Sequence, residues 1–437
     1  MSVDFIVLAA GNSSRMRSSL PKFFHTIAGK PIIRYIIDTI NDCNPQTTIV
    51  VTKDKIKNSE HFSDVTVKIQ SEPLGTADAV KCALDALSSE YTIILCGDMP
   101  LISAKHLKNL AETSSKNALI AMILPPEFQY MPYGRIVLND NKFDKIVEYK
   151  NATDAEKLIP LANAGIYKIH TELLKKYVPQ IEKNSESGEY YLTDIFNFIE
   201  DVKVIQFSDY EAFHGINTMQ DLAKAETFMQ NQLRQKFMAN GVKLIAPETV
   251  YFSHDTAIEN DVIIEPNVII GNNVKIGAGS HIYAYSYLQD CFIAQNVEIG
   301  PFARIRGNSS FADGAAIGNF VEVKGSTFGA KTKAKHLAYI GDTTIGDKTN
   351  IGAGTITCNY DGVSKHKTTI GSNVFVGSNS TLIAPITIED NSILGAGSTF
   401  TDTVPAGALA IARQRQTNLH QKATDIWHKK GKNKRPN

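Results

Sequence analysis

Aliphatic residues recur every six positions, with occasional slips, over residues 264–400, and this period restricts the fold more than any other feature. The series comprises Ile264, Ile270, Ile276, Ile282, Leu288, Ile293, Ile299, Ile305, Ile317, Val323, Ile345, Ile351, Ile370, Val376, Leu382, Ile388 and Leu394. No helix has a period of six, and a single strand cannot be this long. The pattern therefore predicts short strands joined by tight corners and wound into a parallel β-helix. The alternative is an ordinary β-sandwich with chance spacing.

A small residue, most often glycine, follows many members of this series, as at Gly271, Gly277 and Gly352. We expect the aliphatic side chain to point into the coil, and the small residue to let the backbone turn a corner where a Cβ would often clash. The repeat resembles the left-handed β-helix of hexapeptide-repeat acyltransferases, a known exception to right-handed crossovers.

Length and charge restrict the remaining possibilities. At 437 residues the chain exceeds one compact core, so two or three domains are expected. Lys plus Arg and Asp plus Glu are each 45, which argues against nucleic acid or a polybasic membrane surface as the main partner. Five cysteines without paired spacing indicate reduced thiols in a cytoplasmic protein. The N-terminus lacks a signal peptide pattern, and no membrane span is expected.

The first two hundred residues alternate strand-like and helix-like segments. The expected strands cover residues 3–10, 47–52, 65–70, 91–96 and 118–124, and helical patterns cover 32–40 and 77–87. This alternation predicts a doubly wound, Rossmann-like α/β domain with a largely parallel sheet over residues 1–217. A linking helix is expected over 218–240, and the β-helix with its C-terminal tail over 241–437. The basic tail from residue 414 is expected to be solvated, or to fold over a neighbouring subunit.

Ligands of such sheets gather at the carboxyl ends of the strands. After the first expected strand, the chain reads Leu8-Ala9-Ala10-Gly11, followed by Arg15 and Lys22. Small residues let backbone N–H groups face a nucleotide, and the two cations suit a triphosphate. The spacing matches neither a Walker P-loop nor a dinucleotide-binding loop. A plain strand-to-helix turn with solvated cations is the alternative.

Three further segments point to the same chemistry. Gln70 can read a base edge through its amide, and Gly75, followed by Thr76, permits close backbone approach. Asp98 leaves a buried strand, where a carboxylate suits Mg²⁺, and the amide oxygen of Asn217 could be a second ligand. Alone, Asp98 could equally be a helix cap or turn acid.

These four segments resemble the sugar-phosphate nucleotidyltransferases in order, spacing and strand context. The segments Tyr133-Gly134-Arg135-Ile136, Ile146-Val147-Glu148, Asn163-Ala164-Gly165 and 188–195 resemble the sugar-side motifs of N-acetylglucosamine-1-phosphate uridylyltransferases. The resemblance implies that Leu8 to Gly11, Gln70, Gly75 and Thr76 bind the uridine nucleotide, and that Lys22 and Arg15 contact phosphates. It implies that Gly134, Glu148 and Asn163 bind the acetamido sugar, and that Asp98 and Asn217 ligate Mg²⁺.

The sequence departs from that pattern at four positions. Ser13 and Pro132 stand where glycines are common, Cys96 takes a position often occupied by Tyr, and Asp78 one often occupied by His. We expect Asp78 to place a second acid near the phosphate end of the site. None of the four removes a proposed cation or metal ligand.

Two irregularities in the six-residue repeat indicate a second site. The repeat fades near residues 324–340, where Lys324, His336 and Tyr339 lie, and a polar segment over 358–367 reads as a projecting loop. Insertions on solenoids map to binding faces, and an imidazole can take a proton from an attacking amine. A structural histidine is the alternative for His336.

The segments 301–306, 335–342 and 350–362 closely resemble the acetyltransferase half of the bifunctional enzymes of UDP-N-acetylglucosamine synthesis, which join N-acetylglucosamine-1-phosphate uridylyltransferase to glucosamine-1-phosphate N-acetyltransferase. The resemblance implies His336 as general base. It implies an amino-sugar phosphate site of Arg306, Lys324, Tyr339, Asn350 and Lys365. It implies an acetyl-CoA site of Ala353, Asn359, Tyr360, Ser378, Ala396 and Arg413, and association as a homotrimer through the β-helix.

We therefore predict a bifunctional enzyme that acetylates glucosamine 1-phosphate from acetyl-CoA and then transfers uridylyl from UTP with Mg²⁺. A nucleotidyltransferase with a merely structural β-helix is one alternative, but the sequence segments around His336 and Asn359 argue against it. A non-catalytic regulatory subunit is another, and it should have lost Asp98, Lys22 or Arg15.

Overall fold

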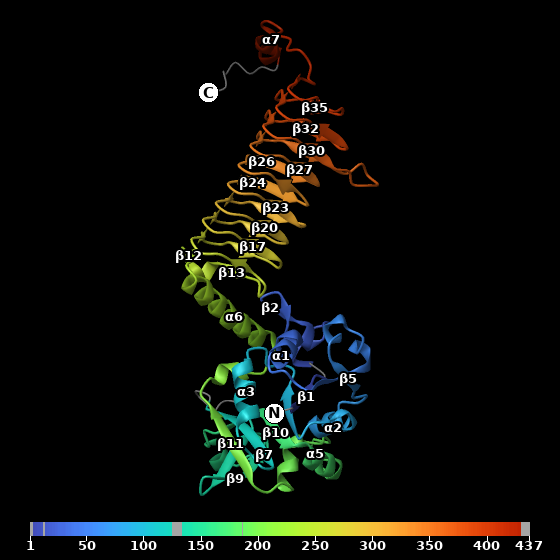
Figure 1. Ribbon diagram of the computed structural model, residues 1–437, viewed down its shortest axis with the longest axis vertical. Coiled ribbons are helices and arrows are strands. Elements are labelled where there is room, and N and C mark those ends of the chain that lie inside the picture. Colours follow the sequence, from blue (N-terminus) through green and yellow to red (C-terminus); the bar gives the residue numbers. More distant parts are fainter. Residues whose placement is uncertain (1–2, 12–13, 125–132, 186, 430–437) are drawn as a thin grey trace. The chain divides into compact units, whose positions relative to one another are not determined.

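The computed structural model describes residues 3–11, 14–124, 133–185 and 187–429. The chain divides into two compact units, Met1–Leu233 and Arg234–Asn437 (Figure 1).

The first unit is built on a twisted sheet that contains nine strands among the described residues, with β11-β7-β10-β6-β1-β4-β5 as its main path. Strands β1, β4, β5 and β6 are parallel, whereas β10 runs antiparallel to both β6 and β7. The strands are β1 Val3–Leu8, β4 Thr47–Thr52, β5 Thr66–Ile69, β6 Tyr91–Cys96, β7 Ala118–Ile123, β8 Arg135–Asn139, β9 Lys142–Val147, β10 Ala162–His170 and β11 Val202–Phe207, beside a small hairpin of β2 Thr26–Ile27 and β3 Lys30–Pro31.

Helices pack through apolar stripes that recur at helical spacing. On α1, the side chains of Ile33, Ile36, Ile37 and Ile40 join one buried cluster, whereas Ala77 and Val80 of α2 join a second. Two separate cores on one sheet are the mark of a doubly wound fold, which confirms the predicted class. The helices are α1 Ile32–Asn41, α2 Thr76–Lys81, α3 Ala104–Glu112, α4 Asp154–Lys157, α5 Thr171–Tyr177 and α6 Met219–Ala239.

The helical pattern over residues 77–87 folds differently from its prediction. Helix α2 ends at Lys81, and a 3-10 turn, Leu84–Ala86, follows. Backbone bonds from Ala83 to Val80 and from Ala86 to Ala83 replace the α-helical pattern. Ala83 and Leu87 are both buried in this tighter turn.

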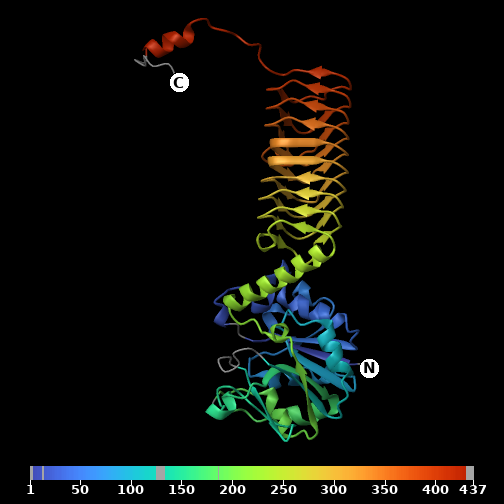
Figure 2. The ribbon, with the colours of Figure 1, turned by 90° about the vertical axis from the view of Figure 1, so that its left-hand side faces the viewer.

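The second unit is the predicted left-handed parallel β-helix (Figure 2). Its aliphatic series lines the interior in register, since Ile264 pairs with Ile282, and Ile299 with Ile317. The strands are β12 Lys243–Leu244, β13 Tyr251–Phe252, β14 Ala257–Ile258, β15 Ile263–Ile264, β16 Ile269–Ile270, β17 Val274–Ile276, β18 His281–Ile282, β19 Tyr287–Leu288, β20 Cys291–Ile293, β21 Glu298–Ile299, β22 Arg304–Arg306, β23 Ser309–Phe311, β24 Ala316–Lys324, β25 Thr327–Phe328, β26 Lys333–Gly341, β27 Thr343–Ile345, β28 Asn350–Ile351, β29 Ile356–Cys358, β30 Thr368–Ile370, β31 Phe375–Val376, β32 Thr381–Ile383, β33 Ile386–Ile388, β34 Ile393–Leu394, β35 Thr399–Phe400 and β36 Leu409–Ala410.

The glycines of the repeat are required by close packing between coils. A Cβ added to Gly277 would lie 2.7 Å from the carbonyl carbon of Ala294 in the next coil. The left-handed backbone of the corner comes two residues after the glycine, as at Asn273 after Gly271 and Asn379 after Gly377. Asparagine tolerates that conformation better than other non-glycine residues, so the corner is shared between two residue types.

Helix α6 packs through apolar side chains along its length. Ala225 belongs to a buried cluster in the first unit, and Leu222 and Met229 pack against it, while the Phe237 ring lies 4.7 Å from that of Phe252 in the second unit. At the far end of the chain, the short helix α7, Lys422–Lys429, is exposed. Among the described residues, no helix combines the length and apolar character that a membrane crossing requires.

Candidate functional sites

Three of the four sequence motifs of the first unit meet at one edge of its sheet. Backbone N–H groups of Ala9, Gln70 and Gly97 donate to the carbonyls of Val51, Thr52 and Leu8, over 2.8, 3.0 and 2.9 Å. These bonds continue the parallel ladder just past β1, β5 and β6, so the segments that follow each strand lie side by side. The predicted nucleotide loop, base-reading amide and metal acid therefore share one edge.

Two cations and two oxygen ligands converge at this edge. The Lys22 ammonium lies 2.6 Å from Asp98 Oδ2 and donates to Asn217 Oδ1 over 2.9 Å. Arg15 donates to the same Asn217 oxygen over 2.9 Å. Asn217, far along the chain, is brought here because the Ile216 N–H donates to the Asp98 carbonyl over 2.9 Å. The structure thus unites the four residues predicted to handle phosphate and metal.

The predicted base-reading residues form a second group. Gln70 Nε2 donates to the Gly75 carbonyl over 3.0 Å and to Asp78 Oδ2 over 2.8 Å. Thr76 Oγ1 accepts from the Leu192 N–H over 2.9 Å, which ties the segment after residue 188 to α2. The Asp78 carboxylate, expected near the phosphate end, lies against the Gln70 amide.

The predicted sugar-side residues also come together. The Asn163 N–H donates to the Gly134 carbonyl over 2.9 Å, and a Cβ on Gly134 would lie 3.6 Å from Glu148 Oε2. Burial raises the pKa of Glu148, whose Oε1 accepts from Thr193 Oγ1 over 3.3 Å. The Asn163 amide donates to Tyr167 Oη over 2.7 Å. Asn163 thereby fixes the end of β10 beside the other two residues.

Several supporting residues had been assigned no role from the sequence. The Tyr133 hydroxyl lies 2.9 Å from His214 Nδ1, and His214 Nε2 lies 3.4 Å from Asp221 Oδ1. Asp221 Oδ2 accepts from the Asn217 N–H over 3.0 Å, so this chain of contacts supports a predicted metal ligand. Arg135 is fully buried and donates to the Tyr133 carbonyl. Thr218 and Asp221 form a capping box at the start of α6, since the Asp221 N–H donates to Thr218 Oγ1 and the Thr218 N–H to Asp221 Oδ2, and this is a signal that the sequence carries.

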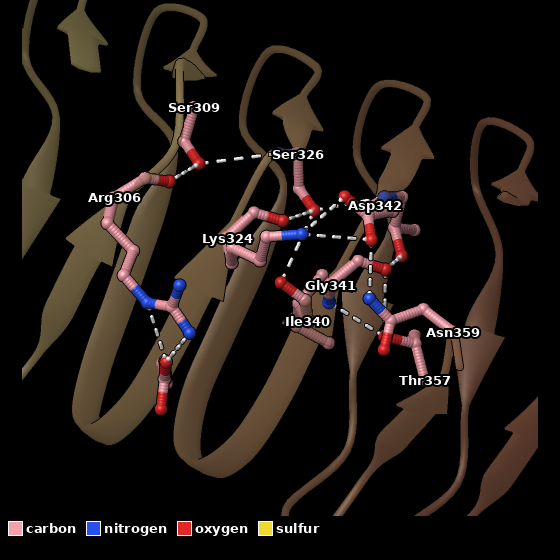
Figure 3. Close-up of polar contacts among 11 residues, drawn as sticks. Arg306, Ser309, Lys324, Ser326, Ile340, Gly341, Asp342, Thr357 and Asn359 are labelled. Atoms are coloured by element: carbon pink, nitrogen blue, oxygen red, sulfur yellow. Dashed lines mark hydrogen bonds and ion pairs between the residues drawn. The ribbon is translucent and has the colours of Figure 1, made fainter. Parts of the chain in front are cut away.

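In the second unit, three cations gather on one face of the coil, and Figure 3 shows two of them, Arg306 and Lys324. Lys324 Nζ lies 3.1 and 3.2 Å from the two oxygens of Asp342, and Arg306 donates through two nitrogens to Glu322 Oε1. The pKa of Lys365 is lowered because the Lys324 ammonium lies beside it, with Arg306 contributing. Crowded positive charge of this kind favours an anion.

Asp342 also organises the predicted acetyl-CoA side of this face. Its Oδ2 accepts from Asn359 Nδ2 over 2.5 Å, so one carboxylate holds both Lys324 and Asn359 (Figure 3). The neighbouring Gly341 must lack a side chain. A Cβ there would lie 2.7 Å from Tyr339 Oη and 2.8 Å from Asn359 Nδ2. Tyr339 and Asn359, from two different coils, therefore lie over Gly341.

His336 is exposed at a corner of the coil. It lies in β26 opposite Asn319 of β24, and its Nδ1 is 2.9 Å from Asn319 Oδ1. The amide oxygen can only accept, so Nδ1 donates the hydrogen bond and Nε2 keeps its lone pair. This geometry suits a base that takes a proton through Nε2.

Most of the predicted acetyl-CoA residues continue along the same corner. The Gly354 N–H donates to the Leu337 carbonyl, the Asn379 N–H to Ala353, and the Gly397 N–H to Ser378, over 2.7, 2.7 and 2.8 Å. Arg413 then donates to the Ala396 carbonyl over 2.6 Å. Ala353, Ser378, Ala396 and Arg413 thus form a column that starts beside His336. Asn350 lies apart from the cation cluster, in β28 opposite Lys333.

The predicted projecting loop is present and is ordered by its own side chains. Asp361 accepts from the Val363 and Ser364 N–H groups over 2.8 and 2.7 Å, and these bonds with His366 hold its pKa well below the usual range. Tyr360 is exposed, and its hydroxyl donates to the Gly362 carbonyl. The loop carries Lys365 to the cation cluster.

Two departures from the family pattern, Ser13 and Pro132, lie outside the described residues. Cys96 ends β6, and burial raises its thiol pKa to about 12, so it is a poor nucleophile at neutral pH. Among the described residues, no group of three or more His, Cys, Asp or Glu side chains could hold a metal ion. The predicted Mg²⁺ site, with one carboxylate and one amide, is not of that kind.

Comparison with known proteins agrees with this architecture. A family model for the MobA-like NTP transferase domain matches residues 5–161, and one for bacterial transferase hexapeptide repeats matches 255–289 and 367–402. The bifunctional protein GlmU of Zymomonas mobilis is 42% identical over 97% of this chain and 96% of its own length. The GlmU proteins of Wolbachia pipientis and Streptococcus agalactiae are 41% and 39% identical, over 94% and 96% of this chain and 97% of their own lengths. The chain therefore belongs to the family of bifunctional GlmU proteins, the transferases of UDP-N-acetylglucosamine synthesis that its motifs predict.

Proposed function

We propose that the two activities of the family are divided between the two sites described above, with uridylyl transfer in residues 1–217 and acetyl transfer in residues 241–437, on either side of a linking helix over 218–240. The observation that carries this proposal is the presence of two separate clusters of cations. One surrounds Asp98 and Asn217, and the other lies on the coil near His336. Each substrate of the two reactions bears a phosphate.

In the acetyl transfer step, the amine of glucosamine 1-phosphate attacks the thioester carbonyl of acetyl-CoA, and the thiol of CoA leaves. His336 Nε2 takes the proton that the amine loses. Arg306, Lys324 and Lys365 hold the sugar phosphate, with Tyr339 nearby on the sugar. The cofactor lies along the column from Ala353 to Arg413, where small side chains leave room beside the base, with Asn359 and Tyr360 at its side.

In the uridylyl transfer step, a phosphate oxygen of N-acetylglucosamine 1-phosphate attacks the α-phosphorus of UTP in line, and pyrophosphate leaves. Lys22 and Arg15 neutralise the charge that develops on the phosphates. Leu8 to Gly11, Gln70, Gly75 and Thr76 hold the nucleotide, while Gly134, Glu148 and Asn163 hold the sugar.

Asp98 and Asn217 fit a divalent cation, because their side-chain oxygens already converge on one positive charge, the Lys22 ammonium, at 2.6 and 2.9 Å. Both are the hard oxygen donors that Mg²⁺ prefers. When bound, Mg²⁺ supplies charge neutralisation and orientation at the phosphate oxygens.

We further propose that the chain forms a homotrimer through the β-helix. A ladder of exposed aromatic rings at one corner supports it, since Tyr285 stacks on Phe302 with centroids 4.9 Å apart, and Phe302 on Phe320 at 5.2 Å. Leu337, next to His336, continues this ladder and is 62% exposed. Apolar surface of this kind favours burial against a second copy. Phe302→Asp should reduce the mass measured by light scattering, whereas Phe292→Asp, at an exposed phenylalanine on another face, should not.

We also place the enzyme in the cytoplasm, where UTP and acetyl-CoA are available. The five cysteines, all free, are consistent with a reducing compartment.

The central test uses purified protein with glucosamine 1-phosphate, acetyl-CoA, UTP and Mg²⁺, omitting each component in turn. Asp98→Ala should abolish UDP-sugar formation and leave acetyl transfer largely intact. His336→Ala should abolish acetyl transfer and leave UDP-sugar formation largely intact when N-acetylglucosamine 1-phosphate is supplied in place of glucosamine 1-phosphate. Equal loss of both activities in either variant would contradict the division into two sites.

A further inference from the structure

We propose that Asp78 selects the nucleotide by fixing the orientation of the Gln70 amide, so that the enzyme accepts uracil and rejects cytosine. The inference rests on the proposed function, in which Gln70 faces the base. It assigns a role to an acid that the family resemblance leaves unexplained.

The amide of Gln70 can sit in only one orientation. Its Nε2 group donates to Asp78 Oδ2 over 2.8 Å and to the Gly75 carbonyl over 3.0 Å, and both partners are acceptors only. Turning the amide over would place Oε1 against two oxygens and lose both bonds. Gln70 is only 4% exposed, so water cannot readily replace them. The oxygen Oε1 accepts no hydrogen bond from any described residue and remains available to a ligand.

Both acceptors are held in place by the surrounding backbone. Gly75 has a φ of 118°, and a Cβ there would lie 2.4 Å from the Tyr190 carbonyl oxygen, so its peptide is tightly packed. The Tyr190 N–H donates to the Leu74 carbonyl over 2.8 Å, which closes the same contact. Asp78 lies in the first turn of α2 and forms no ion pair within the described part of the chain. Its side chain is therefore committed to the Gln70 amide.

An amide oxygen aimed at the base distinguishes the two pyrimidines. N3 of uracil carries a proton and can donate to Gln70 Oε1. N3 of cytosine carries a lone pair, which would face the oxygen lone pairs and leave two acceptors without a donor. Asp78 acts here as a positioning residue, because it contacts Gln70 and not the base.

The test compares kcat/KM for UTP and CTP in the uridylyl half-reaction, with N-acetylglucosamine 1-phosphate and Mg²⁺. Asp78→Leu removes the acceptor at similar size, and Asp78→Ala is a second variant in case leucine disturbs α2. Both should lower the UTP to CTP ratio by about tenfold or more, chiefly through KM for UTP. Asp78→Asn keeps an acceptor oxygen and should hold the ratio within about threefold of wild type. The thermal unfolding midpoint of the same preparations reports whether the unit that contains α2 is folded in each variant.

An unchanged ratio in the leucine and alanine variants, with equal loss for both nucleotides, would overturn the inference and leave Asp78 a structural residue of α2. Wild-type protein that uses CTP as well as UTP would overturn it too, while leaving the proposed function intact. Wild-type protein that uses neither nucleotide would instead overturn the proposed function itself.

Discussion

Asn319→Ala is expected to slow acetyl transfer by about two- to twelvefold. The amide oxygen of Asn319 lies 2.9 Å from His336 Nδ1 and holds the imidazole with Nε2 facing outward. Both residues are accessible, so water competes for this bond, and an ordinary hydrogen bond is worth about 0.5–1.5 kcal/mol. Converted to a rate, that range corresponds to about two- to twelvefold. Removing the base itself, in His336→Ala, should cost about 10²- to 10⁴-fold.

The assay follows release of the CoA thiol with saturating glucosamine 1-phosphate, so that kcat and KM for acetyl-CoA are separated. A residue that only orients the base should lower kcat and leave KM for acetyl-CoA near its wild-type value. Asn319→Asp keeps an acceptor at the same position and should recover most of the rate. Asn296→Ala, at an exposed asparagine on another corner, serves as the matched control.

Two outcomes would refute the reasoning. A kcat unchanged by Asn319→Ala would mean that the contact does not orient the imidazole. A loss as large as that of His336→Ala would mean that Asn319 does more than hold a ring. Uridylyl transfer by the same variant should be unaffected, and its loss would indicate a folding defect instead.

Three other predictions follow from the two sites. Gly341→Ala should lower acetyl transfer by about tenfold or more, because the added Cβ would displace the ends of two flexible side chains, Tyr339 and Asn359. The thermal unfolding midpoint of this variant should be nearly unchanged. Acetyl transfer at the wild-type rate would contradict this prediction. Burial raises the pKa of Glu148, so its carboxylate, the form that accepts from a sugar hydroxyl, is lost as pH falls through that raised value. KM for N-acetylglucosamine 1-phosphate should therefore rise as pH falls. Glu148→Gln, which cannot titrate, should show less of that rise. Chelation of Mg²⁺ with EDTA should stop uridylyl transfer but spare acetyl transfer in the same sample, and equal inhibition of both would argue against a metal site confined to Asp98 and Asn217.

The sequence was most informative where one residue type repeats at a fixed interval. The period of six predicted the coil because every inward position has the same environment, so Ile264, Ile282 and Ile299 are nearly interchangeable. Strands such as Tyr91–Cys96 were equally readable, because burial on both faces leaves an uninterrupted apolar run.

Contacts between coils could not be predicted in the same way. Asp342 contacts both Lys324 and Asn359 only because consecutive coils stack in register. The sequence around Asp342 does not indicate that this acid, rather than another, contacts both residues. Asn319 reaches His336 for the same reason. The contact between Asp78 and Gln70 could not be predicted, because Gln70 precedes an irregular segment whose path depends on the packing of Gly75 against Tyr190.

The loop over residues 359–367 interrupts the chain without interrupting the coil. Lys333 pairs with Asn350 before it, and Asn350 pairs with Phe375 after it, so the hydrogen-bonded ladder resumes in step. The length and composition of this loop can therefore vary at little cost to the stability of the β-helix. Exchanging it wholesale is accordingly a direct route to enzymes of this architecture with altered acyl acceptors.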